Sequence, residues 1–368
     1  MASEVGSSGA GPERAADLVL DSWRLRVSGD PDLLAGVLAV MAPPCTVDAV
    51  AVGAGWTVRV QRDEQDELPC ADDVDALFTD RPVLVSPCGG PQLAVVDASD
   101  GLLRLLGRYR SGSAAALLEV DRAWRTTRVV VPEAGPGRSW LDWVARLFFS
   151  SRMLAGGWRL LHASAVVVDG AAVLFIAGQG GGKSTLAYRA CAQFMADDLV
   201  MVGPGGIVAG WPTRAAPPVG LTAPEGAGPE REQSVEGTRQ RVLFTPHEHR
   251  AVLGCAPPTP LGVVVHVTAD LDPGGAAGRV AWATPLEAAE VDAVMTRAAD
   301  VPAQRLYSTD LLGLTGGPSL VRVDRPDLGW DTMLGGAAGA RLTLDDLRAL
   351  PQAPVWEALS VWLPGVKR

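Results

Sequence analysis

The sequence predicts an α+β protein with an α/β core, and three features of its 368 residues point to this class. Short apolar runs separated by Gly, Pro and Asp follow one another from residue 23 to residue 131, which is typical of β-strands. A segment with helical apolar spacing then spans residues 139–155. Residues 161–200 have the pattern of strand, turn, strand, glycine-rich loop, helix and strand. We therefore expect a mostly β N-terminal region followed by a mixed α/β region.

The N-terminal region is predicted from its apolar runs and turn residues. Residues 1–16 have neither the basic start nor the apolar stretch of a signal peptide, so we expect a disordered tail there. From residue 17 to residue 136 we expect one mostly β region, which ends in the Gly- and Pro-rich segment 133–137. Its expected elements are a helix over residues 31–41 and strands over residues 23–27, 47–52, 56–60, 83–85, 93–96, 115–120 and 129–131.

The rest of the chain, residues 137–368, is expected to form a second domain. It begins with the amphipathic helix over residues 139–155, in which Trp140 and Trp143 are expected to pack against the hairpin that follows. Residues 203–240 are rich in Gly and Pro, and we expect a mobile loop there that covers the site described below. Later expected elements are a strand over residues 261–267, a helix over residues 286–299 and a helix with Thr343 as N-cap.

A hairpin leads into a glycine-rich loop in the middle of the chain. Asp169-Gly170 separates two apolar runs, and the second run, residues 171–177, suits a strand buried on both faces. Glycines let backbone N–H groups wrap closely around phosphates, and the start of the following helix adds partial positive charge. The pattern predicts a nucleotide-phosphate site in which Lys183 reaches the β- and γ-phosphates and Ser184 binds Mg²⁺. Its residues are Gly178, Gln179, Gly180, Gly181, Gly182, Lys183, Ser184 and Thr185.

This loop departs at one position from the P-loop pattern G-x-x-x-x-G-K-[ST]. The pattern has glycine where this chain has Ala177. Alanine fits there without strain only if its φ is negative, unless Gly178 takes over the turn. The alternative is a glycine-rich loop that holds no ligand, but its place between a buried strand and a helix favours nucleotide binding.

Two adjacent carboxylates, Asp197 and Asp198, interrupt the apolar segment 194–200, which we expect to be a strand. Asp is seldom buried without a partner because an unpaired buried charge is costly. Beside a phosphate-binding loop, the partners that suit the pair are Mg²⁺ and a hydroxyl proton. Both are catalytic candidates, one as general base and one on the metal, and we name Ser184 and Asp198 as metal ligands. The alternative is that one of the two only ends the strand.

A family resemblance follows from these motifs. His162 before a strand, the loop 178–185 and the sequence Ala196-Asp197-Asp198 resemble the core of HPr kinase/phosphorylase, and more closely the HPr-kinase-like proteins encoded beside peptide-modifying enzymes. The resemblance covers residues 161–200 and implies an HPr-kinase/PEP-carboxykinase-like P-loop core. It implies a role for His162 near the phosphates or the acceptor, while a structural histidine is the alternative. The alanine at 177 and a short segment between the loop and the Asp pair argue against HPr itself as substrate.

The resemblance implies a cytoplasmic kinase that uses ATP and Mg²⁺ to phosphorylate a Ser or Thr hydroxyl of a peptide or protein, for example a ribosomally made precursor peptide. Its catalytic residues would be Asp197, Asp198, His162 and Lys183. A small-molecule kinase on the same core and a nucleotide-binding regulatory module without transfer activity are the alternatives. A PEP-carboxykinase-like enzyme is less favoured, because the four histidines of the chain form no recognisable metal set. The sequence leaves open which molecule is the acceptor and whether the nucleotide is ATP or GTP. It also leaves open whether the protein has phosphorylase activity and whether it forms homo-oligomers.

Composition narrows the range of partners. A net charge of −10 argues against nucleic acid and anionic membrane surfaces. The five cysteines form no C-x-x-C pair, which predicts free thiols in a reducing compartment, and no apolar run reaches the length of a membrane span. Residues 247–249, His-Glu-His, lack the spacing of a zinc site. Arginines that suit phosphate or substrate contacts are Arg214, Arg239 and Arg241.

Overall fold

The computed structural model describes most of the chain in eighteen ranges. These are residues 14–42, 44–48, 55–63, 67–80, 83–85, 91–99, 101–109, 115–132, 134–178, 180–189, 193–212, 233–236, 239–242, 255–269, 281–299, 311–314, 329–344 and 352–363.

The chain divides into two compact units, each with a large sheet and few helices. Unit 1 comprises residues 1–39, 45–149 and 310–321, and unit 2 comprises residues 40–44, 150–309 and 322–368. The α+β class is therefore confirmed. The main division falls after residue 149, whereas the sequence suggested a boundary before residue 137, because most of the long helix α3 (Ala134–Ala155) belongs with unit 1.

Unit 1 is built on a nine-stranded sheet in the order β3-β1-β2-β4-β9-β8-β7-β6-β5. The pairs β2/β4 and β4/β9 are parallel, and the other pairs are antiparallel. The strands are β1 (Arg14–Leu20), β2 (Trp23–Gly29), β3 (Thr46–Asp48), β4 (Trp56–Arg62), β5 (Val83–Val85), β6 (Gln92–Ser99), β7 (Leu102–Arg108), β8 (Ala116–Asp121) and β9 (Thr126–Val131). The strand β1 begins at Arg14, inside the range expected to be a tail, and residues 1–13 lie outside the described ranges.

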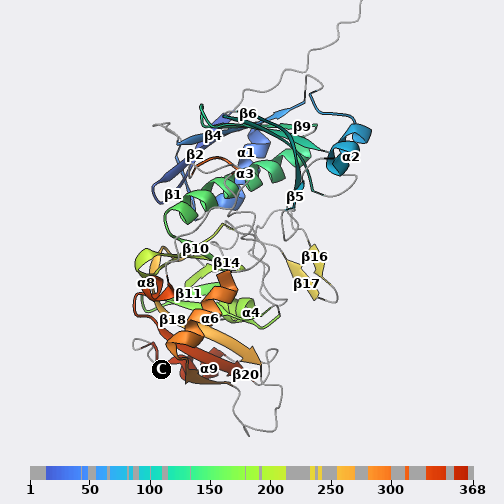
Figure 1. Cartoon of the computed structure of the whole chain (residues 1–368). Helices are drawn as coiled ribbons and strands as arrows, with labels where there is room; N and C mark the ends of the chain where they lie inside the picture. The colour runs from blue at the N-terminus through green and yellow to red at the C-terminus, as the bar shows by residue number, and fades with distance from the viewer. Residues whose placement is uncertain are drawn as a thin grey trace, which may run out of the picture. The chain divides into compact units, whose positions relative to one another are not determined.

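Three helices accompany this sheet (Figure 1): α1 (Pro31–Met41), α2 (Ala71–Asp80) and α3. The sheet curves around α1 and α3 in the figure, and its close contact with α3 is explained by a glycine. A Cβ at Gly107 of β7 would lie 2.3 Å from Trp140, so the indole occupies the space above that strand. Trp140 and Trp143 are both buried, as expected, and Trp140 packs on β7 and Tyr109.

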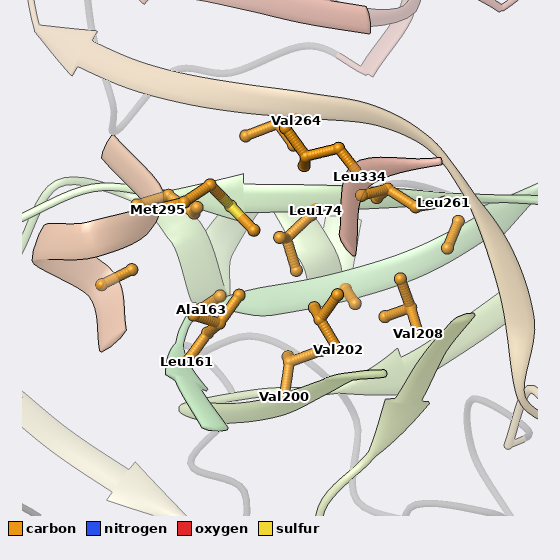
Figure 2. Close-up of a cluster of buried hydrophobic side chains, with 14 of the residues drawn as sticks. Leu161, Ala163, Leu174, Val200, Val202, Val208, Leu261, Val264, Met295 and Leu334 are labelled. Atoms are coloured by element: carbon orange, nitrogen blue, oxygen red, sulfur yellow. The ribbon is translucent and has the colours of Figure 1, made fainter. Parts of the chain in front are cut away.

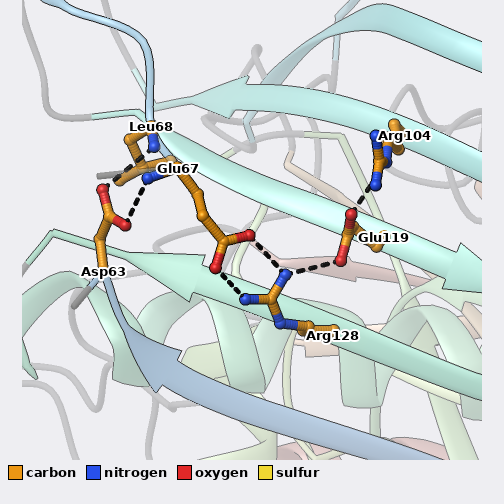
Figure 3. Close-up of polar contacts among 6 residues, drawn as sticks. All are labelled: Asp63, Glu67, Leu68, Arg104, Glu119 and Arg128. Carbon is orange, nitrogen blue, oxygen red and sulfur yellow. Dashed lines mark hydrogen bonds and ion pairs between the residues drawn. The ribbon is translucent and has the colours of Figure 1, made fainter. Parts of the chain in front are cut away.

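A network of charged side chains, shown in Figure 3, links strands β7, β8 and β9 of this sheet to Glu67. The Arg128 guanidinium donates to Glu67 and, at 2.7 Å, to Glu119, which also accepts from Arg104 at 2.8 Å. The Asp63 carboxylate accepts hydrogen bonds from the backbone N–H groups of Glu67 and Leu68 and so helps to hold Glu67 in place. The hydrogen bond from the Arg128 guanidinium lowers the pKa of the Glu67 carboxyl.

Unit 2 has a second nine-stranded sheet in the order β10-β14-β15-β18-β12-β11-β13, with β20 paired to β18 and β19 paired to β20. The pairs β12/β18 and β18/β20 are parallel. The strands are β10 (Arg159–His162), β11 (Ser164–Val168), β12 (Ala171–Ile176), β13 (Gln193–Ala196), β14 (Leu199–Gly203), β15 (Ile207–Gly210), β18 (Thr259–Ala269), β19 (Ala281–Pro285) and β20 (Ala338–Leu344). A separate hairpin consists of β16 (Gln233–Glu236) and β17 (Arg239–Val242).

The strand β12 lies at the centre of unit 2 and is buried on both faces, as its apolar sequence predicted. Val173 and Phe175 face a core shared with α4 (Lys183–Arg189) and α9 (Gln352–Leu359). Leu174 and Ile176 face the other core, shown in Figure 2, with α6 (Ala288–Ala299) and α8 (Trp330–Leu334). Alternate residues therefore anchor β12 to opposite layers, which fixes the position of the loop that follows it.

Several local expectations for unit 2 can be compared with the structure. The hairpin turn is confirmed, since Val168 pairs with Ala171 and both turn residues between them have positive φ. Residues 203–212 belong to β14, the 3-10 turn η1 (Pro204–Gly206), β15 and its end, so this part of the expected mobile loop is ordered structure. Thr343 is wrong as an N-cap, because it pairs with Trp282 inside β20. None of the described helices combines the length and apolarity needed to cross a bilayer.

Candidate functional site

The site lies where two neighbouring chain segments bend at the same level of the sheet. The first segment passes from β10 to β11 at Ala163, and the second passes from β13 to β14 at Asp197-Asp198. β10 pairs with β14, with His162 opposite Leu199, and β11 pairs with β13, with Ala165 opposite Ala196. This register brings residues 162–164 alongside residues 197–199.

The two carboxylates occupy a tight turn and not the continuous strand that the sequence suggested. The Leu199 N–H donates to the Asp197 carbonyl at 2.8 Å, and Asp198 between them has a φ of 68°. A three-residue turn with positive φ at its centre is rare and strained for a residue with a Cβ. The turn divides the pair: Asp197 is 5% exposed, whereas the Asp198 side chain is 65% exposed.

Asp197 is a buried carboxylate that accepts hydrogen bonds from two hydroxyl groups. Ser164 Oγ donates to Asp197 Oδ1 at 2.5 Å, and Ser184 is also hydrogen-bonded to this carboxylate. Burial raises the pKa of the Asp197 carboxyl, the bonds from the two serines oppose that rise, and the charge of Asp198 adds to it. Asp197 therefore connects the glycine-rich loop, through Ser184, to β11, through Ser164.

Asp198 faces a different partner. The Nε2 atom of His162 lies 3.4 Å from Asp198 Oδ1, and the His162 side chain is 28% exposed. Both groups remain accessible to solvent, in contrast to Asp197. The resemblance implied a place for His162 near the phosphates or the acceptor, and in the structure its contact is with Asp198.

The glycine-rich loop presents open backbone on one side. A Cβ at Gly178 or Gly180 would meet no heavy atom within 4 Å, and Gly180 and Gly182 have φ of 75° and 91°. Ala177 and Gly178 are not among the described residues with positive φ, so alanine at 177 is unstrained and Gly178 does not take over the turn. Open glycine backbone of this kind is suited to close approach by phosphate oxygens.

Lys183 opens α4 and is only 6% exposed. A buried ammonium group requires anionic or polar neighbours, and this one is next in sequence to Ser184, which contacts Asp197. The hydroxyl of Ser184 and the carboxylate of Asp197 are hard oxygen ligands of the type that Mg²⁺ prefers. The residues present therefore fit a magnesium ion, with most of its coordination left to water and phosphate. The described residues contain no group of three or more His, Cys, Asp or Glu side chains that could hold a metal ion by themselves.

The other predicted residues are placed as follows. Thr185 lies in the first turn of α4, and Gln179 lies outside the described ranges. Arg214 lies outside them too, and only the backbone is described for Arg239 and Arg241 in β17. Ser164 was missed, because its partner Asp197 is 33 residues away in sequence and is brought close by the pairing of β11 with β13. Its position two residues after His162, before an apolar run, was the available signal.

The comparisons with known proteins assign no family. No protein-family model matches the sequence, and no curated protein gives a significant match.

Proposed function

We propose that this chain is an ATP- and Mg²⁺-dependent phosphotransferase that phosphorylates a Ser or Thr hydroxyl of a peptide or protein. The observation that carries the proposal is the contact of Ser184 with the buried Asp197, beside the open glycine loop and the buried Lys183. A hydroxyl directly after the loop lysine, held by a carboxylate from a neighbouring strand end, is the arrangement that P-loop enzymes use for a nucleotide-bound magnesium ion.

In this proposal the phosphate side of the site consists of the loop 178–185 and Asp197. Backbone N–H groups and the Lys183 ammonium group hold the phosphate oxygens. Ser184 and Asp197 hold Mg²⁺, which when bound neutralises negative charge on the transferred phosphoryl group. This revises the assignment made from sequence, in which Asp198 shared the metal with Ser184, because Ser184 contacts Asp197.

The acceptor side consists of Asp198 and His162. Asp198 is exposed and adjacent in sequence to the metal ligand, so it can reach a hydroxyl group that approaches from solvent. It takes the acceptor proton as general base, and His162, at 3.4 Å, orients the carboxylate. The strained turn at Asp198 supports this role, since backbone strain concentrates at functional sites.

The peptide or protein acceptor and the P-loop kinase core rest on the resemblance to the HPr-kinase-like proteins over residues 161–200. The five cysteines without a C-x-x-C pair favour a reducing compartment such as the cytoplasm for this activity. The negative net charge favours acceptors without extended acidic runs and argues against nucleic acid as a partner.

The test uses the full chain, Mg²⁺, γ-labelled ATP and a panel of serine-containing peptides. Wild type should label a peptide, and Lys183→Ala and Asp197→Asn should label none above background. Asp169→Asn is the matched control, because Asp169 is an exposed carboxylate with positive φ at the other end of β11. It should label the peptide as wild type does.

The alternatives have distinct outcomes in the same experiment. Label transferred only to a small hydroxyl compound would replace the peptide acceptor with a metabolite. ATP binding with no transfer to peptide, small molecule or water would overturn the enzyme proposal in favour of a nucleotide-binding regulatory module.

A further inference from the structure

Gly181, in the middle of the loop, has no conformational reason to be glycine. Gly180 and Gly182 have positive φ, which disfavours any residue with a Cβ. Gly181 is not among the described glycines with positive φ, so its backbone conformation admits alanine. What opposes a side chain at residue 181 is a neighbouring atom.

That atom is the Cβ of Ala177. A Cβ at residue 181 would lie 2.7 Å from Ala177 Cβ and 3.1 Å from the Gly178 carbonyl oxygen. Carbon atoms in contact are ordinarily about 3.5–4.0 Å apart, so one of the two segments would have to move. Ala177 is itself buried and directly follows β12, which both cores of unit 2 hold in place.

The loop also makes a hydrogen bond close to this methyl group. The Gly181 N–H donates to the Gly178 carbonyl at 3.1 Å, and both the Ala177 Cβ and the Gly178 carbonyl oxygen lie near the position of a Cβ at residue 181. A segment that moved to admit a Cβ would break this hydrogen bond.

We propose that the Ala177 methyl group is a positioning element of the phosphate-binding loop. It supports the hydrogen-bonded residues Gly178 and Gly181 in the arrangement that presents their backbone to phosphate, and it makes glycine necessary at residue 181. The inference rests on the proposed function, because it takes phosphate as the ligand of the loop. Alanine at 177 also samples fewer conformations than glycine would, so less conformational freedom is lost when the ligand binds.

The test is a double-mutant cycle in which a methyl group is removed at residue 177 and one is added at residue 181. The variants are Ala177→Gly, Gly181→Ala and the two combined, each in the full chain. Gly329→Ala is the control, because residue 329 lies outside the loop and a Cβ there would meet open space at a φ of −49°. Two quantities are measured for each variant: the dissociation constant for pyrophosphate with Mg²⁺, by calorimetry, and the denaturant midpoint of unfolding.

The proposal gives a definite pattern. Gly181→Ala weakens pyrophosphate binding by about tenfold or more and lowers the midpoint, because the clash distorts the turn. Ala177→Gly weakens binding about two- to fivefold through added loop freedom. The combined variant returns to within about threefold of Ala177→Gly, since contacting residues couple. Gly329→Ala stays within about twofold of wild type.

Two results would overturn the inference while leaving the proposed function intact. If the combined variant binds as poorly as Gly181→Ala, the added Cβ obstructs phosphate directly and Ala177 gives no support. If Ala177→Gly binds as wild type does, the methyl group has no positioning role. A wild-type chain that binds neither pyrophosphate nor ATP refutes the proposed function and the positioning role together, and coupling in the unfolding midpoints would then mark the contact as purely structural.

Discussion

The Ser164 hydroxyl donates a 2.5 Å hydrogen bond to Oδ1 of Asp197, a carboxylate that Ser184 also contacts. Three separate segments meet in this arrangement: the start of β11, the turn after β13 and the first turn of α4. Because the carboxylate is buried, each hydroxyl offsets part of the cost of removing it from water. The glycine-rich loop is thereby tied to β11, which begins two residues after His162 at the end of β10.

Removal of the Ser164 hydroxyl should therefore be costly. Ser164→Ala leaves Asp197 with one hydroxyl donor fewer and should lower the free energy of unfolding by about 1–3 kcal/mol. Ser151→Ala is the control, since Ser151 is equally buried but its hydroxyl has no hydrogen-bond partner. Chemical denaturation of both variants checks the prediction, and equal losses would show that the contact with Asp197 adds nothing.

Metal-free stability should depend on pH through Asp197. Its pKa is raised by burial, so the folded chain holds this proton more tightly than the unfolded chain does. The resulting stability is full below the ordinary Asp pKa of about 3.9 and is lost as pH rises through the raised value. In EDTA, the thermal stability of wild type should fall as pH rises from the ordinary Asp pKa through the raised pKa of Asp197. The thermal stability of Asp197→Asn should not fall over this range.

Thermal unfolding across the acidic to neutral range, with and without Mg²⁺, checks this pH dependence. At neutral pH, Mg²⁺ should raise the Tm of wild type and leave that of Asp197→Asn unchanged. Superimposable pH curves for the two proteins would contradict the account of Asp197.

Loss of the His162 imidazole should affect transfer more than binding. His162→Ala removes the group that orients Asp198, 3.4 Å away, and should slow phosphoryl transfer about 10- to 100-fold. ATP affinity should stay within about twofold, because His162 contacts the acceptor side. Calorimetry and a transfer assay on the same preparation separate the two quantities, and a parallel loss of both would place His162 in the phosphate site instead.

The contact between β7 and α3 can be tested in unit 1. Gly107→Ala places a Cβ 2.3 Å from the Trp140 ring and should lower the free energy of unfolding by about 1–3 kcal/mol through overpacking. Gly55→Ala, whose Cβ would lie 3.4 Å from the nearest atom, should change it by no more than about 0.5 kcal/mol. Denaturant unfolding followed by tryptophan fluorescence measures both, and equal stabilities would rule out tight packing of Trp140 on β7.

Much of the fold could be predicted wherever local signals were strong and agreed with one another. Residues 31–41 form the expected helix α1, and the Asp169-Gly170 turn joins the expected strands. Thr343 shows the limit of such signals, because strand pairing with β18 and β19 overrides a local capping pattern. The strand β1 was not predicted, for a related reason. It is stabilised by hydrogen bonds to its partner β2, whereas its own sequence has no clear strand pattern.

The site was predicted in its residue types but not in its pairings. An apolar run on each side of Asp197-Asp198 resembles one strand, and only the turn with positive φ at Asp198 separates the roles of the two carboxylates. The register of β10 with β14 then decides that His162 meets Asp198, and the shift in β11 accompanies the contact of Ser164 with Asp197. Pairings of this kind depend on tertiary structure and leave no periodic trace in the sequence.

The central claim is that Asp198 takes the acceptor proton at a site where Asp197 and Ser184 hold the metal. The most direct measurement is single-turnover transfer of the γ-phosphoryl group from pre-bound labelled ATP, in wild type and in Asp198→Asn. We expect rapid transfer by wild type, and transfer at least about 100-fold slower by Asp198→Asn with an equal amount of ATP bound. Equal rates in the two proteins, or no transfer by wild type to any acceptor, would contradict the account.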